Sequence, residues 1–242
     1  MTWSIVARDT SGALGVAVAS KFFAVGTLCA HGQSGAGTLS TQALVNPLLA
    51  GPALRGMADG REPVALLAEL LAADPGRAMR QFHMVDASGR SAAHTGSECI
   101  DWCGHLVREG YSVAGNMLAG QQVIAATADH YAAHPQLSFA ERLIEALAAG
   151  DAAGGDKRGK QGAALLIYSG QEYPSLDLRV DDHAEPIVEL RRLHQVSLER
   201  FQPFLRCMAS RECPAGIIDR SVIEAEIAHF QEARKKSSGT AA

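Results

Sequence analysis

The sequence predicts an α+β protein, built as a four-layer αββα sandwich with a helical extension at its C-terminus. Hairpins of short strands alternate with helix pairs, as expected for stacked layers and not for a doubly wound parallel sheet. No glycine-rich phosphate loop is present, because GNMLAG at 115–120 misses the required spacing. From residue 186 the hydrophobic period becomes helical. We expect a sandwich domain at 1–183 and a helical extension with a disordered tail at 184–242.

The first predicted hairpin begins at residue 2. Apolar and polar residues alternate at 3–7, turn residues follow at 9–12, and a second apolar run covers 15–20. This order is typical of two antiparallel strands joined by a short turn. The chain therefore enters a sheet at once.

The following segment predicts a third strand, a helix and a second hairpin. Small residues at 35–43 favour a strand, and a loop at 46–51 leads to a helix at 63–73. The second hairpin has strands at 82–85 and 91–94, separated by Asp-Ala-Ser-Gly.

A short strand at 111–114 is expected to run through a turn at Gly115-Asn116 into a helix at 121–131. The next helix begins at Ser138, which forms a capping box with Glu141, and glycine 150 is expected to end it.

A glycine-rich loop at 151–159 then leads to strands at 163–168 and 176–180. The helical extension follows from residue 186. Its last helix is expected to begin with a second capping box, formed by Ser221 and Glu224.

Composition limits the function classes. A chain of 242 residues with 47% hydrophobic and 20% charged residues is typical of a globular protein of one main domain. The net charge of −4 and the absence of a basic, aromatic-rich stretch argue against a nucleic-acid partner.

Cysteine usage and the N-terminal sequence predict a cytoplasmic protein. The five cysteines are an odd number, and a chain of this size needs no disulfides. MTWSIVARD lacks the charged and apolar regions of a signal peptide, and no apolar run approaches the roughly 18 residues of a membrane helix. We expect no membrane partner.

Thr2 is the most informative single residue, because the first strand begins directly at it. Removal of Met1 would give Thr2 a free α-amine beside its own hydroxyl. With a pKa of about 7.7 to 8, that amine can accept the hydroxyl proton at neutral pH. Thr2 would then supply both nucleophile and base. The alternative is that a Met-Thr start has no functional meaning.

Six ordered blocks within about residues 2 to 195 carry a family resemblance. They are MTWSIVARD, GALGVAVASKFFAVG, TQALVNP, VDASGRSAAHTGS, GYSVAGNMLAG and GDAAGGDKRGKQGAALL. The chain resembles the bacterial and archaeal family of unknown function 1028, whose proposed relationship is to N-terminal-nucleophile (Ntn) hydrolases. The resemblance implies the Ntn fold more strongly than an activity, because one fold hosts many reactions.

The order of elements also resembles proteasome-type subunits. That resemblance implies Thr2 as nucleophile, Asn116 near its amine and Asp151 as the carboxylate that orients the amine. Lys21 would lower the pKa of the amine or bind a substrate carboxylate. The chain departs from the pattern in two places, since Asn116 replaces a serine and Lys21 lies earlier than the catalytic lysine. Proton transfer is therefore the least defined step.

Four further residues are candidates for substrate binding. Gln42 and Asn46, together with Asn116, carry amides that could stabilise an oxyanion or act as ordinary loop caps. Asp156 and Arg158 in the glycine-rich loop would bind a polar substrate, or would pair with each other in solvent.

We therefore expect an amidohydrolase that cleaves the C–N bond of a small amide or peptide-like substrate, with no cofactor and no metal. Cys99, Cys103 and His105 lack the second ligand pair of a zinc site. The alternative is a catalytically silent Ntn-like module for binding or assembly. The apolar stripe at 187–205 predicts a homo-oligomer.

Overall fold

The computed structural model describes residues 2–239 and the side chains of residues 2–236. The chain forms two compact units, Met1–Arg191 and Arg192–Ala242. The division falls inside helix α6 (Pro186–Ser197), whereas the sequence placed a boundary before this helix.

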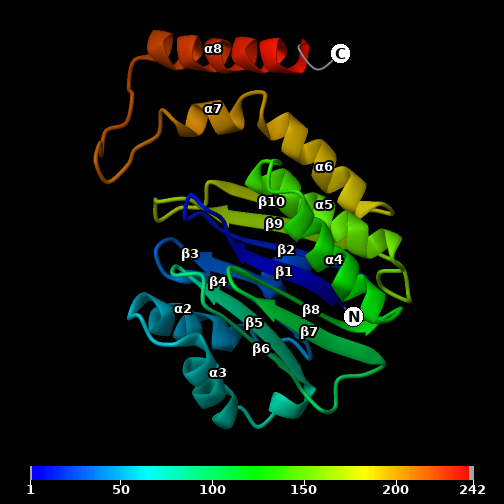
Figure 1. The fold of residues 1–242 in the computed structure, drawn as a ribbon. Coiled ribbons are helices and arrows are strands. Elements are labelled where there is room, and N and C mark those ends of the chain that lie inside the picture. The colour runs from blue at the N-terminus through cyan, green and yellow to red at the C-terminus, as the bar shows by residue number, and fades with distance from the viewer. Residues whose placement is uncertain (1, 240–242) are drawn as a thin grey trace. The chain divides into compact units, whose positions relative to one another are not determined.

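The first unit contains a six-stranded antiparallel sheet with the N-terminal hairpin at its centre. The strand order is β10-β9-β2-β1-β8-β7 (Figure 1). The bounds are β1 Thr2–Arg8, β2 Leu14–Ser20, β7 Trp102–Arg108, β8 Tyr111–Leu118, β9 Gly162–Tyr168 and β10 Leu176–Val180.

A second antiparallel sheet has four strands in the order β3-β4-β5-β6. The bounds are β3 Ala30–Gln33, β4 Gly37–Ala43, β5 Arg80–Asp86 and β6 Ser91–Thr95. Strands of the two sheets contact each other, notably β1 with β4 and β5 with β8.

Helices lie against both sheets. The pair α4 (Gln121–Ala133) and α5 (Phe139–Ala152) contacts the six-stranded sheet, and the pair α2 (Ala50–Ala58) and α3 (Pro63–Ala72) contacts the four-stranded sheet (Figure 1). The short helices of this unit are α1 Val25–Cys29, η1 Pro47–Leu49 and η2 Arg77–Met79. The fold is thus α+β with two antiparallel sheets and flanking helices.

The two faces of β1 meet different surroundings, because successive side chains of a strand alternate. Trp3 packs toward α5, where a Cβ on Gly150 would lie 2.9 Å from Trp3 Nε1, so this helix position requires glycine. On the opposite face Val6 joins an apolar cluster with Val85 of the other sheet. Ser4 on that same face makes polar contacts with the other sheet. The space between the sheets is therefore apolar at one end and polar at the Thr2 end.

Local sequence signals predicted several elements correctly. Both hairpins, helices α3 and α4 and strands β9 and β10 are present close to their expected bounds. The capping box of Ser138 and Glu141 at the start of α5 is also confirmed. Missed elements are α1, β3 and β7, together with α2, which begins inside the expected loop.

Two expected element ends are wrong. Asn116 lies inside β8, paired with Thr2, and not in a turn, because β1 and β8 continue their ladder through this position. Glycine 150 does not end α5, which continues to Ala152 and so includes Asp151. Close packing against Trp3 explains this glycine better than a helix stop does.

The second unit is helical and includes α7 (Phe201–Leu205) and α8 (Arg220–Gly239). Ser221 and Glu224 do not form the expected capping box: the Ser221 hydroxyl donates to Asp219, and Glu224 pairs with Arg200. Helix α8 reaches into the predicted disordered tail, and residues 240–242 lie outside the described residues. None of the helices in the described part of the chain has the length and apolar character of a membrane span.

Candidate functional site

Thr2 lies at the start of the central strand, flanked on both sides by paired residues. Its partners are Ser20 in β2 and Asn116 in β8. The residue is only 5% exposed, and its Oγ1 lies 3.1 Å from the Ser20 hydroxyl oxygen. The Asn116 amide nitrogen donates to the Thr2 carbonyl at 3.4 Å. Thr2 is thus enclosed by polar partners between the two sheets.

Gln81 of β5 is the centre of the polar network beside Thr2. Its Nε2 donates to the backbone carbonyls of Gly104 and Gly115 at 3.0 and 2.8 Å. Carbonyl oxygens only accept hydrogen bonds, so these two contacts fix which end of the Gln81 amide is nitrogen. Gln81 Oε1 therefore points the other way, where it accepts from Asn116 Nδ2 at 3.0 Å and from Gln42 Nε2 at 2.8 Å.

The orientation of the Gln81 amide also fixes the orientation of the Gln42 amide. Since the Gln42 amide nitrogen is directed at Gln81, Gln42 Oε1 accepts, and the Ser4 and Ser40 hydroxyls donate to it at 2.7 and 3.1 Å. The Ser4 oxygen is then the acceptor for His83 Nε2 at 2.7 Å. His83 consequently carries its proton on Nε2, and each donor has a definite direction.

His83 is held neutral at the far end of this network. It is fully buried, and the Ser112 hydroxyl lies 3.2 Å from its Nδ1. Burial, assisted by the charge of His105, lowers the pKa of His83 from 6.5 to about 3. A protonated His83 would disrupt the donor order that runs to Asn116.

We expect the network to make the protein sensitive to acid. Between pH 6.5 and about 3 the unfolded chain binds a proton at His83 that the folded chain does not, so stability present above pH 6.5 is lost as the pH falls. The loss at pH 4 is on the order of 3 kcal/mol. Urea titrations over this range should show a flatter pH dependence for His83→Gln than for the wild type. His183→Gln, at an exposed position, is the control and should keep the wild-type slope.

Asp156 contacts the ends of the strands on both sides of β1. Its Oδ2 accepts from the backbone N–H of Lys21, the residue after the Ser20 partner of Thr2, at 3.0 Å. Its backbone bridges to Leu118, two residues beyond Asn116. The side chain is fully buried and also accepts from Arg158. Asp156 therefore joins the ends of the two strands that pair with β1, one residue beyond Ser20 and two residues beyond Asn116.

Asp151 and Lys21 have other partners. The Asp151 carboxylate is paired with Lys160, which also binds Glu185. The Lys21 side chain is exposed, and its ammonium lies 3.5 Å from the Lys160 carbonyl. The ion pair of Asp151 thus lies at the end of α5.

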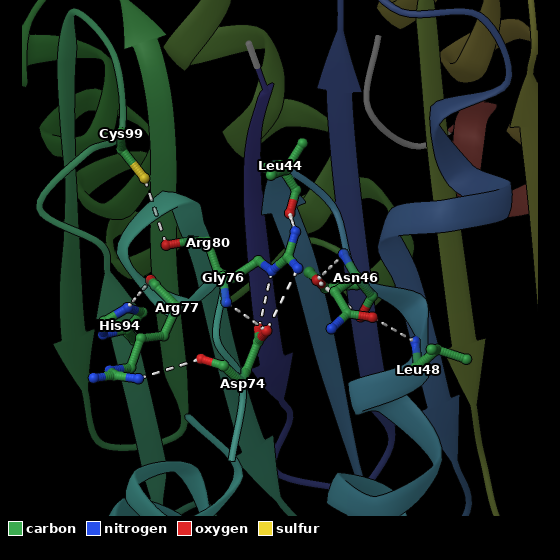
Figure 2. A network of polar contacts seen from close by, with 10 residues as sticks. Leu44, Asn46, Leu48, Asp74, Gly76, Arg77, Arg80, His94 and Cys99 are labelled. Atoms are coloured by element: carbon green, nitrogen blue, oxygen red, sulfur yellow. Dashed lines mark hydrogen bonds and ion pairs between the residues drawn. The ribbon is translucent and has the colours of Figure 1, made fainter. Parts of the chain in front are cut away.

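Asn46 belongs to a separate network near the end of β4. Its side chain accepts from Leu48 N–H at 3.2 Å and caps the short helix η1 (Figure 2). Asn46 also stabilises the ionised form of Asp74, and together with Arg80, the principal partner, it lowers the pKa of this carboxyl. Its contacts are those of a loop cap.

A cavity of about 180 Å³ opens beside Asn116, the partner of Thr2 in β8. Its walls come from the end of β4, the segment before β5, the loop between β6 and β7, and β8. The lining residues are Ala43, Leu44, Met79, Glu98, Cys99, Ile100, Asn116 and Met117. Asn116 therefore connects this cavity to the start of the central strand.

The structure brings together Thr2, Asn116 and Gln42, and places Lys21, Asp156 and Arg158 at the strand ends beside them. Ser20, Gln81 and His83 were missed as functional candidates. Ser20 could have been found as the last residue of a strand predicted to pair with Thr2. Gln81 carries no sequence signal, because its partners come from four other strands.

The cysteines near the cavity bind backbone oxygens. The thiols of Cys99 and Cys103 donate to the carbonyls of Arg80 and Cys99, and His105 contacts Thr95. Across the described residues, 2–239, no group of three potential metal ligands comes together.

A family model described as "Family of unknown function (DUF1028)" matches residues 2–190. The chain belongs to this family. The resemblance expected from the sequence blocks is thereby confirmed. No curated protein matches the sequence of this DUF1028 protein.

A solved structure from the same family is similar over most of the chain. The crystal structure of protein SPO2555 from Silicibacter pomeroyi matches with a TM-score of 0.84 and 31% identity, covering 90% of this chain and 96% of that one. Anbu (ancestral beta-subunit) from Yersinia bercovieri matches with a TM-score of 0.32 and 13% identity over 81% of this chain and 94% of that one. The second similarity is too low to bear on fold or function.

Proposed function

We propose that this DUF1028 protein is an Ntn-type amidohydrolase on an αββα sandwich, with Thr2 Oγ1 as the nucleophile. The observation that carries the proposal is the position of Thr2. It begins the central strand, its side chain lies among Ser20 and Asn116 between the sheets, and Asn116 lines the adjacent cavity. The substrate class is a small amide or peptide-like molecule.

The reaction needs only groups that removal of Met1 would expose. Thr2 Oγ1 attacks the substrate carbonyl carbon while the Thr2 α-amine takes the hydroxyl proton. The C–N bond breaks as that proton passes to the leaving nitrogen, which leaves an ester on Thr2. A water molecule, deprotonated by the same amine, then releases the acid and restores Thr2. No cofactor enters these steps.

Asp156, and not Asp151, is the carboxylate we assign to the amine. It is buried, accepts from Lys21 N–H and bridges to Leu118, so it lies beside the residues that follow both strand partners of Thr2. A carboxylate there favours the ammonium form and orients it. Lys21 contributes its backbone, and Arg158 holds Asp156 in place.

The amide donors of the network limit what can bind the oxyanion. Gln42 Nε2 donates to Gln81 and is therefore not available to bind the substrate. Gln42 instead helps to position its neighbours. Asn116 Nδ2 likewise donates to Gln81 and to the Thr2 carbonyl, so we assign Asn116 to positioning Thr2 and leave the developing negative charge to backbone N–H groups near Thr41 and Gln42.

The first test is the intact mass of the native-start protein, followed by treatment with a β-lactone as an acylating probe. We expect a mass short by one methionine residue and a single covalent adduct on Thr2. Retention of Met1 with no adduct would instead favour the catalytically silent module, because the extra residue blocks the base and covers the hydroxyl.

The silent module has its own supporting observation in the second unit. Phe201, Phe204 and Ile218 are large apolar side chains that stay exposed there, at 46%, 39% and 84%. Exposed apolar residues of this kind are typical of surfaces that associate. Under either function we propose a cytoplasmic homo-oligomer that uses the 184–242 extension for self-association.

A further inference from the structure

We propose that the cavity beside Asn116 binds a primary ammonium group on a short apolar chain, as the part of the substrate next to the scissile amide. This inference rests on the proposed function, because Asn116 joins the cavity to Thr2. It names a substrate class that the nucleophile alone does not specify.

The walls of the cavity are mostly apolar. Leu44, Met79, Ile100 and Met117 supply large side chains, and the volume of about 180 Å³ is that of a small group and not of a long peptide. An apolar wall favours burial of methylene groups. A chain of a few methylenes therefore fits both the surface and the volume.

Contacts of Arg80 hold the walls in place. Its guanidinium donates to the Leu44 carbonyl at 2.6 Å and pairs with Asp74 at 2.9 Å, while its own carbonyl accepts from the Cys99 thiol (Figure 2). The positive charge behind this wall is thus neutralised by Asp74. The cavity is preformed, and its lining residues include no cation to attract a carboxylate.

Two residues of the lining adopt a backbone conformation that costs energy. Ala43 and Met117 have φ angles of 66° and 55°, in the left-handed region that residues with a Cβ rarely adopt. Such a conformation is unfavourable and persists only when the surrounding structure holds it in place. Both lie at the ends of their strands, where they shape the cavity.

The polar groups that face the cavity are acceptors. The Asn116 amide nitrogen donates a hydrogen bond to Gln81, so Asn116 Oδ1 points away from the network. Within residues 2–239 no donor is bonded to this oxygen. Glu98 adds an exposed carboxylate at the rim. Two acceptors, one of them charged, match the three N–H donors of an ammonium group.

Protection of Cys99 from alkylation tests the proposal directly. Iodoacetamide labelling of Cys99 would be followed by peptide mass spectrometry with n-pentylamine, n-pentanol or pentanoate present, in the wild type and in Thr2→Ala. We expect pentylamine to slow Cys99 labelling, pentanol to slow it less and pentanoate to leave it unchanged. Labelling of the exposed Cys213 should not respond.

Substitution of Glu98 supplies the matched control. Glu98→Gln should weaken protection by pentylamine about fivefold, the upper range for one exposed ion pair, while Glu109→Gln should not. Equal protection by pentylamine and pentanoate, or none by either, would overturn the proposal. Protection without a lactone adduct on Thr2 would retain the cavity assignment and reject the nucleophile. An adduct on Thr2 without protection of Cys99 would retain the nucleophile and reject the cavity assignment.

Discussion

Thr2→Ala is expected to abolish hydrolysis, with kcat/KM lowered by at least about 10³-fold, because the variant lacks the atom that forms the ester. Thr2→Ser keeps that atom and should retain activity. The loss is measured as steady-state turnover of an amide that the wild type cleaves, alongside β-lactone labelling. Neither turnover nor an adduct should be seen with the alanine variant.

Folding of Thr2→Ala should be little affected. The substitution removes one hydroxyl contact, with Ser20, and one methyl group from the start of a strand. A single hydrogen bond contributes about 1 kcal/mol, so the free energy of unfolding should fall by no more than about 2 kcal/mol. Full turnover by the alanine variant would remove Thr2 from the mechanism.

Gln81→Leu is expected to lower the free energy of unfolding by at least about 3 kcal/mol. The variant keeps a similar volume but leaves the half-buried carbonyl of Gly104 and the buried carbonyl of Gly115 without their side-chain donor. It also removes the acceptor of Asn116 and Gln42. Urea denaturation monitored by circular dichroism measures the change. The exposed Gln121→Leu is the matched control and should stay within about 0.5 kcal/mol of wild type.

Loss of Gln81 should also affect the site. Asn116 would be free to turn its amide, so the residual activity of folded Gln81→Leu should fall in kcat more than it rises in KM. A variant with wild-type stability and kcat would show that the network is not what orients Asn116.

Much of the fold could be predicted because its signals are local. The alternation at 3–7 needs only neighbouring residues, and the capping box at Ser138 needs only the next turn. Elements without such signals were missed. Strand β7 contains Cys103 and Gly104 at a register shift, and its pairing with β8 outweighs the weak strand preference of that segment.

The candidate site divides in the same way. Thr2 could be proposed from its place in the chain, and the glycine-rich loop could be recognised as a loop. The choice between Asp151 and Asp156 could not be made, since both lie in the same short segment. Only the folded chain joins Asp156 to Lys21 and Leu118, next to the strand partners of Thr2, and pairs Asp151 with Lys160.

By itself, the sequence determined the hairpin that begins at Thr2, the family, and those strands and helices that have local signals, because each depends on residues close together in the chain. The tertiary structure decided the polar network and the cavity. Gln81 contacts Gln42, 39 positions away, through the pairing of β4 with β5, and the facing of the two sheets brings Gly104, Gly115 and Asn116 within hydrogen-bonding distance of it. The donor-to-acceptor direction of each hydrogen bond in such a network depends on which buried atoms can donate. These directions are defined only when all partners of the network are in place.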